Sequence, residues 1–175
     1  MLILEGPDGA GKTTLANELS DYFDLPIAPK VVGSDTQPMV DIYDWTNKNL
    51  AAGFQKTIFD RHRLISEPIY SVAMGGERDE KFWEPAWLGA ALRSLQEIEP
   101  IVVWCVPSFR AVNRNVLADD ENKTVWLHIE KIWRGYVNAW LLNTYKYQIL
   151  WDYENTNPQW LRDRVHAMLM HRSTH

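Results

Sequence analysis

Residues 6–13 read Gly-Pro-Asp-Gly-Ala-Gly-Lys-Thr and form a complete phosphate-binding loop, the Walker A or P-loop pattern. A short apolar run, residues 1–4, comes before the loop, and a helical pattern of apolar residues follows it. Glycines let the backbone curl so that successive N–H groups point at phosphate oxygens, and the following helix adds the positive end of its dipole. The order of strand, loop and helix predicts a phosphate site rather than an ordinary glycine turn.

The residue types within this loop predict how ATP would be held. Lys12 would neutralise the β- and γ-phosphates, and the hydroxyl of Thr13 would bind Mg²⁺. ATP and Mg²⁺ are therefore the expected cofactors, and the expected nucleotide contacts are Gly6, Asp8, Gly9, Ala10, Gly11, Lys12, Thr13 and Thr14.

A second chemical signal follows a short apolar strand at residues 56–59, which ends in Asp60-Arg61-His62. A carboxylate at a strand tip beside a phosphate loop can hold Mg²⁺ or its waters, so Asp60 is a candidate metal ligand. The neighbouring Arg61 can clamp a phosphate with two hydrogen bonds. The alternative is a surface ion pair between Asp60 and Arg61. His62 is more simply explained as a capping or packing residue than as a catalyst.

Two arginines follow the apolar run at residues 101–106. Arg110 and Arg114 are four positions apart, so a helix would place both on one face. Two guanidinium groups could cover the bridging phosphates as a lid over residues 108–124 and spread the charge of the transition state. The alternative is a solvated basic helix face.

Strand and helix patterns alternate along the chain, which predicts an α/β fold with a parallel sheet of about five strands and helices on both faces. The chain of 175 residues would form one domain. The expected strands are 2–5, 28–32, 56–59, 101–106 and 148–153, and the expected helices are 12–23, 38–53, 82–98, 124–143 and 158–171.

The charge and composition of the chain limit which partners and which compartment are expected for it. The net charge of −5 provides no global attraction for nucleic acid, so DNA or RNA is an unlikely partner. No apolar stretch is long enough to span a bilayer, and residues 1–4 are too short for a signal peptide. The single cysteine, Cys105, lies in an apolar run and has no partner for a disulfide, which favours a reducing, cytoplasmic compartment.

The loop together with its flanks resembles the start of a thymidylate kinase, in the run Glu5-Gly6-Pro7-Asp8-Gly9-Ala10-Gly11-Lys12-Thr13-Thr14. The later Asp60-Arg61, Ser66 and Tyr70 are similar to that family too, and the short chain looks most like its compact bacteriophage members. The resemblance implies a P-loop kinase fold. It also implies that Asp8 reaches the 3′-hydroxyl of the acceptor sugar, that Arg61 holds the acceptor phosphate and that Asp60 and Tyr70 contact the substrate. Because Gly9 rather than an arginine follows Asp8, the resemblance places the transfer-stabilising charge on the lid arginines.

The chain departs from the family where the acceptor base would be read. Residues 66–70 read Ser-Glu-Pro-Ile-Tyr, and no glutamine follows Tyr70. The expected function is transfer of the ATP γ-phosphoryl group to a deoxynucleoside monophosphate, dTMP in the first place. A deoxynucleoside, or a modified pyrimidine within DNA, is the alternative acceptor. An alternative of another class is a nucleotide-binding switch or ATPase module.

Tryptophans recur at seven-residue spacing at Trp126, Trp133 and Trp140, which predicts one stripe of a long helix. Such a stripe suits core packing. It also suits the seam of a homodimer, because aromatic residues are enriched in the cores of interfaces.

Overall fold

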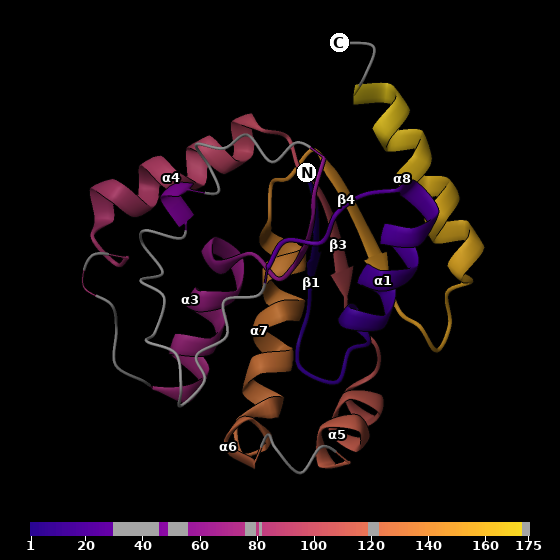
Figure 1. The fold of residues 1–175 in the computed structure, drawn as a ribbon. Helices are drawn as coiled ribbons and strands as arrows, with labels where there is room; N and C mark the ends of the chain where they lie inside the picture. Colours follow the sequence, from indigo (N-terminus) through magenta and orange to yellow (C-terminus); the bar gives the residue numbers. More distant parts are fainter. Residues whose placement is uncertain (30–45, 49–55, 76–79, 81, 119–122, 173–175) are drawn as a thin grey trace.

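Four parallel strands form one sheet in the computed structural model, which describes residues 1–29, 46–48, 56–75, 80, 82–118 and 123–172 (Figure 1). In spatial order they are β2 (Ile58–Asp60), β1 (Leu2–Glu5), β3 (Ile101–Cys105) and β4 (Tyr147–Trp151). Since every pairing is parallel, the carboxyl ends of all four strands lie at one edge of the sheet. Loops that leave this edge can share one ligand, as in other open α/β sheets.

Helices cover both faces of the sheet (Figure 1). One face is covered by α1 (Lys12–Phe23) and α8 (Pro158–Arg172), and the other by α3 (Arg63–Met74), α4 (Pro85–Glu97) and α7 (Ile129–Leu142). The described segments also include α5 (Phe109–Leu117) and the short α6 (Lys123–Trp126). None of the helices in the described segments combines the length and apolar character needed to cross a bilayer.

The two faces of the sheet explain the apolar runs in the sequence. Leu2 and Leu4 pack against α1 and α8, whereas Ile3, between them, packs toward α3, α4 and α7. Successive side chains of a strand point to opposite faces, so a strand covered on both sides must be apolar throughout. The edge strand β4 instead alternates, with Gln148 and Leu150 exposed.

The number of strands differs from the expectation. The described residues contain four strands rather than about five. Of the predicted strand 28–32, residues 30–32 lie outside the described segments. The chain before it makes only an isolated bridge between Ile27 and Ile58, and the Ala28 N–H donates to the Ile58 carbonyl at 2.8 Å. Of the predicted helix 38–53 only residues 46–48 are described, and they are helical.

The predicted long helix over 124–143 is two helices, α6 and α7, separated at Leu127 and His128. The tryptophan stripe is therefore not a stripe of one helix. Trp133 donates from its ring N–H to the Pro107 carbonyl at 2.9 Å, and Trp140 packs against the core beneath α7. These two residues pack within the chain, whereas Trp126 is 42% exposed.

Candidate active site

The glycine loop connects β1 to α1 and packs tightly against the rest of the carboxyl edge. Gly9 and Gly11 have φ angles of 73° and 76°, in the left-handed region that glycine adopts without strain. At Gly6 a Cβ atom would lie 2.1 Å from the carbonyl oxygen of Cys105, so only glycine fits there. The residues after Gly11 begin α1, and Gly11 at the N-cap has no side chain with which to cap the helix. The amides at the start of a helix attract anions.

Lys12 lies inside the loop rather than on its surface, with 6% of the residue exposed. Its ammonium group donates a hydrogen bond to the carbonyl of Pro7 in the same loop. Burial and the positive charge of Arg61 lower the pKa of Lys12 to about 8, although the carboxylates of Asp8 and Asp60 act in the opposite direction. A phosphate would supply the negative charge that this buried ammonium needs.

Thr13 and Asp60 meet across two elements that are distant in sequence. The Thr13 hydroxyl donates to Oδ2 of Asp60 at 2.7 Å, which joins the start of α1 to the tip of β2. Both groups provide hard oxygen ligands, and Mg²⁺ in phosphoryl-transfer sites takes few protein oxygens beside its waters and the phosphates. The pair therefore fits a Mg²⁺ site. The structure brings these two predicted ligands together.

Asp8, Arg61 and Tyr70 form a second cluster on the same loop. The Arg61 guanidinium pairs with Oδ1 of Asp8, and the Tyr70 hydroxyl donates to Oδ2 at 2.6 Å. Arg61 also lies over the Tyr70 ring, 5.0 Å from its centroid. Burial favours the neutral carboxyl, but Arg61, Lys12 and the Tyr70 hydroxyl together hold the pKa of Asp8 below its ordinary value.

The alternative of a surface ion pair between Asp60 and Arg61 is wrong. Asp60 takes Thr13 as a partner, and Arg61 takes Asp8. His62 follows them as the cap of α3, where its Nδ1 accepts the N–H of Leu64 at 3.3 Å. Burial lowers the pKa of His62 to about 4, so this ring is neutral at neutral pH. A capping role fits the expectation for His62.

Glu5 is a buried acid at the end of β1, directly before the glycine loop, and its sequence position alone predicts no role for it. It is 0% exposed, and its Oε1 accepts the backbone N–H of His62 at 2.6 Å. Burial raises the pKa of Glu5 to about 7, opposed in part by this hydrogen bond and by the charges of Arg61 and Lys12. A carboxylate that ends an apolar strand directly before a phosphate loop is a signal that marks the position, although not its role.

The two candidate lid arginines lie on α5, where both side chains are exposed. Nη2 of Arg114 is 4.0 Å from Oε1 of Glu154, and 63% of its side chain is exposed, so this ion pair is weak. Of the predicted lid, residues 119–122 lie outside the described segments. The structure places Arg110 and Arg114 at the same edge of the sheet as the loop without setting either against it.

Asn115, next to Arg114, contacts the glycine loop, which no signal in the sequence predicts. Its Nδ2 donates to the Gly9 carbonyl at 2.9 Å and to the Tyr153 hydroxyl at 2.8 Å, and so it joins α5, the glycine loop and the chain after β4. A Cβ atom on Gly9 would lie 3.0 Å from the Asn115 Cβ and from the Val112 carbonyl oxygen. The helix that carries the arginines therefore packs directly on the loop.

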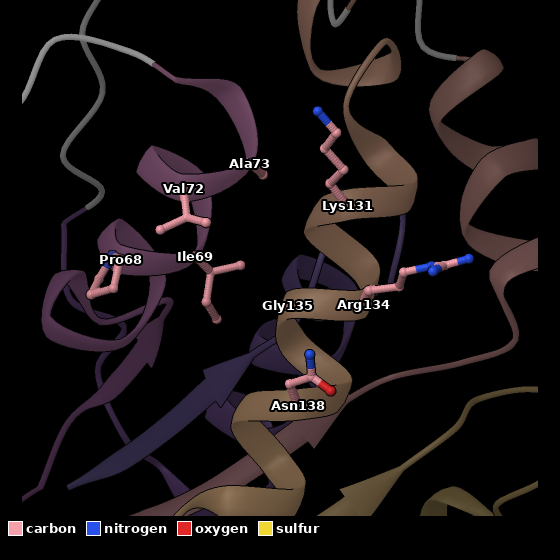
Figure 2. A pocket seen from close by; sticks show the side chains of 8 residues that line it. All are labelled: Pro68, Ile69, Val72, Ala73, Lys131, Arg134, Gly135 and Asn138. Atoms are coloured by element: carbon pink, nitrogen blue, oxygen red, sulfur yellow. The ribbon is translucent and has the colours of Figure 1, made fainter.

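A groove of about 450 Å³ lies between α3 and α7, apart from these residues (Figure 2). Ile69 lies between the two helices beside Gly135, and Val72 and Lys131 also line the groove (Figure 2). None of the predicted site residues lines this groove. The candidate site residues lie at the carboxyl edge of the sheet instead.

No family model matches the sequence, and no curated protein sequence matches it. Among solved structures, the chain is similar to the YorR protein of Bacillus subtilis in complex with phosphorylated GDP. The two share 17% identity over 99% of this chain and 98% of that one, with a TM-score of 0.72.

Deoxyadenosine kinase from M. mycoides is also similar, in two ligand states. With bound dCTP the identity is 15%, the TM-score is 0.60 and all of both chains is covered. With bound dATP the identity is 16% over 96% of this chain and 98% of that one, with a TM-score of 0.55. The likeness extends over nearly the whole chain. The chain therefore has the same α/β fold as these solved structures of YorR and deoxyadenosine kinase.

Proposed function

We propose that the protein transfers the γ-phosphoryl group of ATP to a deoxynucleoside monophosphate, with dTMP as the first candidate. The observation that carries the proposal is the position of Asp8. This carboxylate belongs to the phosphate loop itself, yet it is bonded to Arg61 and Tyr70 from two other elements. A negative charge beside ATP phosphates is unfavourable, so Asp8 needs a further task, and gathering acceptor-side groups next to the donor provides one.

The donor side would be built from Lys12, Thr13 and Asp60. The Lys12 ammonium would exchange the Pro7 carbonyl for phosphate oxygens, while loop amides and the start of α1 hold the rest of the triphosphate. Thr13 and Asp60 would hold Mg²⁺, which would neutralise the charge on the bridging phosphates. Transfer between phosphates demands positioning and charge neutralisation more than acid–base chemistry.

The acceptor side would be built from Asp8, Arg61 and Tyr70. In the free protein their charges and hydroxyl satisfy one another. A sugar 3′-hydroxyl would take one oxygen of Asp8, and the acceptor phosphate would take the outward N–H groups of Arg61. Arg61 can do both because a guanidinium has five donors, of which Asp8 engages only part.

Arg110 and Arg114 would supply charge at the moment of transfer. Both are exposed on a helix that is tied to the glycine loop through Asn115. With α5 held against the loop, a change of side-chain rotamer would bring one of these long guanidinium groups over the phosphates. Such a cover would also exclude water, which otherwise hydrolyses ATP.

A deoxynucleoside is the second candidate acceptor, and two observations favour it. Arg61 is already neutralised by Asp8, which weakens its attraction for a phosphate. In addition, the chain has the fold of a protein described as deoxyadenosine kinase. A nucleoside 5′-hydroxyl must lose a proton on attack, and in this alternative Asp60, at the carboxyl edge of the sheet, would receive that proton instead of binding Mg²⁺.

An acceptor panel separates these proposals. Purified protein is given γ-labelled ATP and Mg²⁺ with each of the four deoxynucleoside monophosphates, the four deoxynucleosides, single-stranded DNA, or no acceptor. Labelled dTDP from dTMP, with much poorer use of 3′-deoxy-dTMP, supports the first proposal, and Asp8→Asn should reduce the preference for the 3′-hydroxyl. If only nucleosides or DNA become labelled, the acceptor is not a monophosphate, and the first proposal gives way to the alternative acceptor. Fast ATP hydrolysis that no acceptor captures favours a switch or ATPase module.

A further inference from the structure

The turn at the tip of β2 holds Arg61 in an unusual backbone conformation. Its φ angle is 74°, in the left-handed region that favours glycine and that costs other residues energy. Such a conformation persists only where neighbouring contacts impose it. The direction of the Arg61 side chain follows from this backbone, so whatever holds the turn also aims the guanidinium.

Strand β1 holds the turn from both ends. On one side the Arg61 N–H donates to the Leu4 carbonyl at 3.0 Å, which continues the sheet by one bond. On the other side the His62 N–H donates to Oε1 of Glu5 at 2.6 Å. The first contact is made by main chain and any sequence could provide it. The second needs an acceptor on the side chain at position 5.

We propose that Glu5 is a positioning residue whose Oε1 fixes the His62 N–H and thereby holds Arg61 in the conformation that aims its guanidinium at the acceptor site. This inference rests on the proposed function, because it takes Arg61 to hold the acceptor phosphate. Glu5 itself is fully buried and lies under the turn, so it acts through Arg61 rather than by touching substrate.

The task assigned to Glu5 requires an oxygen acceptor and not a negative charge. Burial raises the pKa of Glu5 to about 7, so a fraction of the side chains is protonated at neutral pH. A carboxyl group keeps an oxygen for the His62 N–H in both states, whereas a counter-ion for Arg61 would be lost on protonation. Glutamine at position 5 should therefore preserve the hydrogen bond to the His62 N–H. Methionine, which has a similar length but no strong acceptor, should not preserve it.

The test compares Glu5→Gln with Glu5→Met, with folding checked by circular dichroism. We expect Glu5→Met to raise the KM of the acceptor by about tenfold, the loss typical of one buried hydrogen bond, and to change the KM of ATP by less than about twofold. Glu5→Gln should stay within about threefold of the wild type for both substrates. Glu18, exposed on α1, provides the matched control as Glu18→Gln and Glu18→Met.

A double-mutant cycle decides whether Glu5 acts through Arg61. In an Arg61→Ala background, Glu5→Met should raise the acceptor KM no further. Additive effects, equal losses for both substrates, or a Glu5→Gln variant as impaired as Glu5→Met would overturn the inference. If Glu5→Met does not fold, the kinetics of Glu5→Gln alone decide. Wild-type acceptor KM in Arg61→Ala would refute the proposed function instead, whereas a normal Arg61 effect with a silent Glu5→Met refutes only the role of Glu5.

Discussion

Lys12 should make the free protein less stable, although the proposed activity depends on it. The pKa of Lys12 is about 8, against an ordinary value of 10.5, because the ammonium is buried beside Arg61. A difference of 2.5 pKa units corresponds to about 3 kcal/mol of unfavourable free energy for the charged form in the folded state. The unfolded chain binds the proton more tightly than the folded protein does. The destabilisation of the folded state is therefore fully present below about pH 8 and disappears as the pH rises toward 10.5.

Replacement of Lys12 by methionine keeps the length of the side chain and removes its charge. The variant loses the hydrogen bond to Pro7, worth about 1 kcal/mol, so we expect a net gain in unfolding free energy of about 2 kcal/mol at pH 7. For a chain of this size such a gain raises the melting temperature by about 4–8 °C. Phosphoryl transfer should fall to background, because nothing then neutralises the β- and γ-phosphates.

The assay is urea unfolding followed by circular dichroism at pH 7 and again near pH 10.5, with Lys56→Met as the control at an exposed position. The difference between Lys12→Met and the wild type should shrink at the higher pH, because the wild type has then lost its buried charge. A variant that is less stable than the wild type at pH 7, or a difference that does not change with pH, would refute the reasoning. Near-normal kinase activity in the folded variant would refute the assignment of the loop.

Three further changes test other parts of the molecule. Asp60→Asn should lower turnover and move half-saturation to a higher Mg²⁺ concentration, because an amide is a poorer ligand than a carboxylate; an unchanged Mg²⁺ titration would remove Asp60 from the metal site. The double variant Arg110→Ala/Arg114→Ala should lower kcat more than it raises either KM, and a wild-type kcat would leave a plain solvated helix face. Gly135→Ala should cost about 1–3 kcal/mol in urea unfolding, because its Cβ would lie 2.7 Å from Cγ2 of Ile69; unchanged stability would contradict the close approach of α3 and α7.

The parts of the fold that the sequence predicted well are those that depend on local signals. The first strand and first helix were expected at 2–5 and 12–23, and the structure has Leu2–Glu5 and Lys12–Phe23. Glycine spacing and a change of hydrophobic period mark this unit within about twenty residues of chain. No comparable sequence signal predicts the break between α6 and α7. Neither Leu127 nor His128 is a glycine or a proline, and the apolar periodicity continues across them.

The candidate site was predictable as a set of residues but not as a set of partners. Asp60 and Arg61 are adjacent in sequence, which suggests an ion pair between them, yet Asp60 bonds to Thr13 and Arg61 bonds to Asp8, at opposite ends of the loop. Those contacts span 47 and 53 residues, and only the parallel pairing of β1 with β2 creates them. Asn115, 106 residues from Gly9, is a still longer-range case. Side chains of ordinary type acquire such roles from tertiary structure alone.

The close approach of Gly6 to β3 places a cysteine side chain beneath the loop, where its reactivity can be measured. Cys105, the chain's single cysteine, is fully buried there, and its Cβ would lie 3.1 Å from a Cβ on Gly6. Burial raises the pKa of its thiol to about 12, so the closed state offers almost no thiolate to an alkylating reagent. Alkylation therefore requires an opening of the fold that exposes this thiol, and its rate measures how often such openings occur. A ligand that stabilises the folded protein would slow the labelling of this one thiol, so that ligand binding becomes visible without following any reaction.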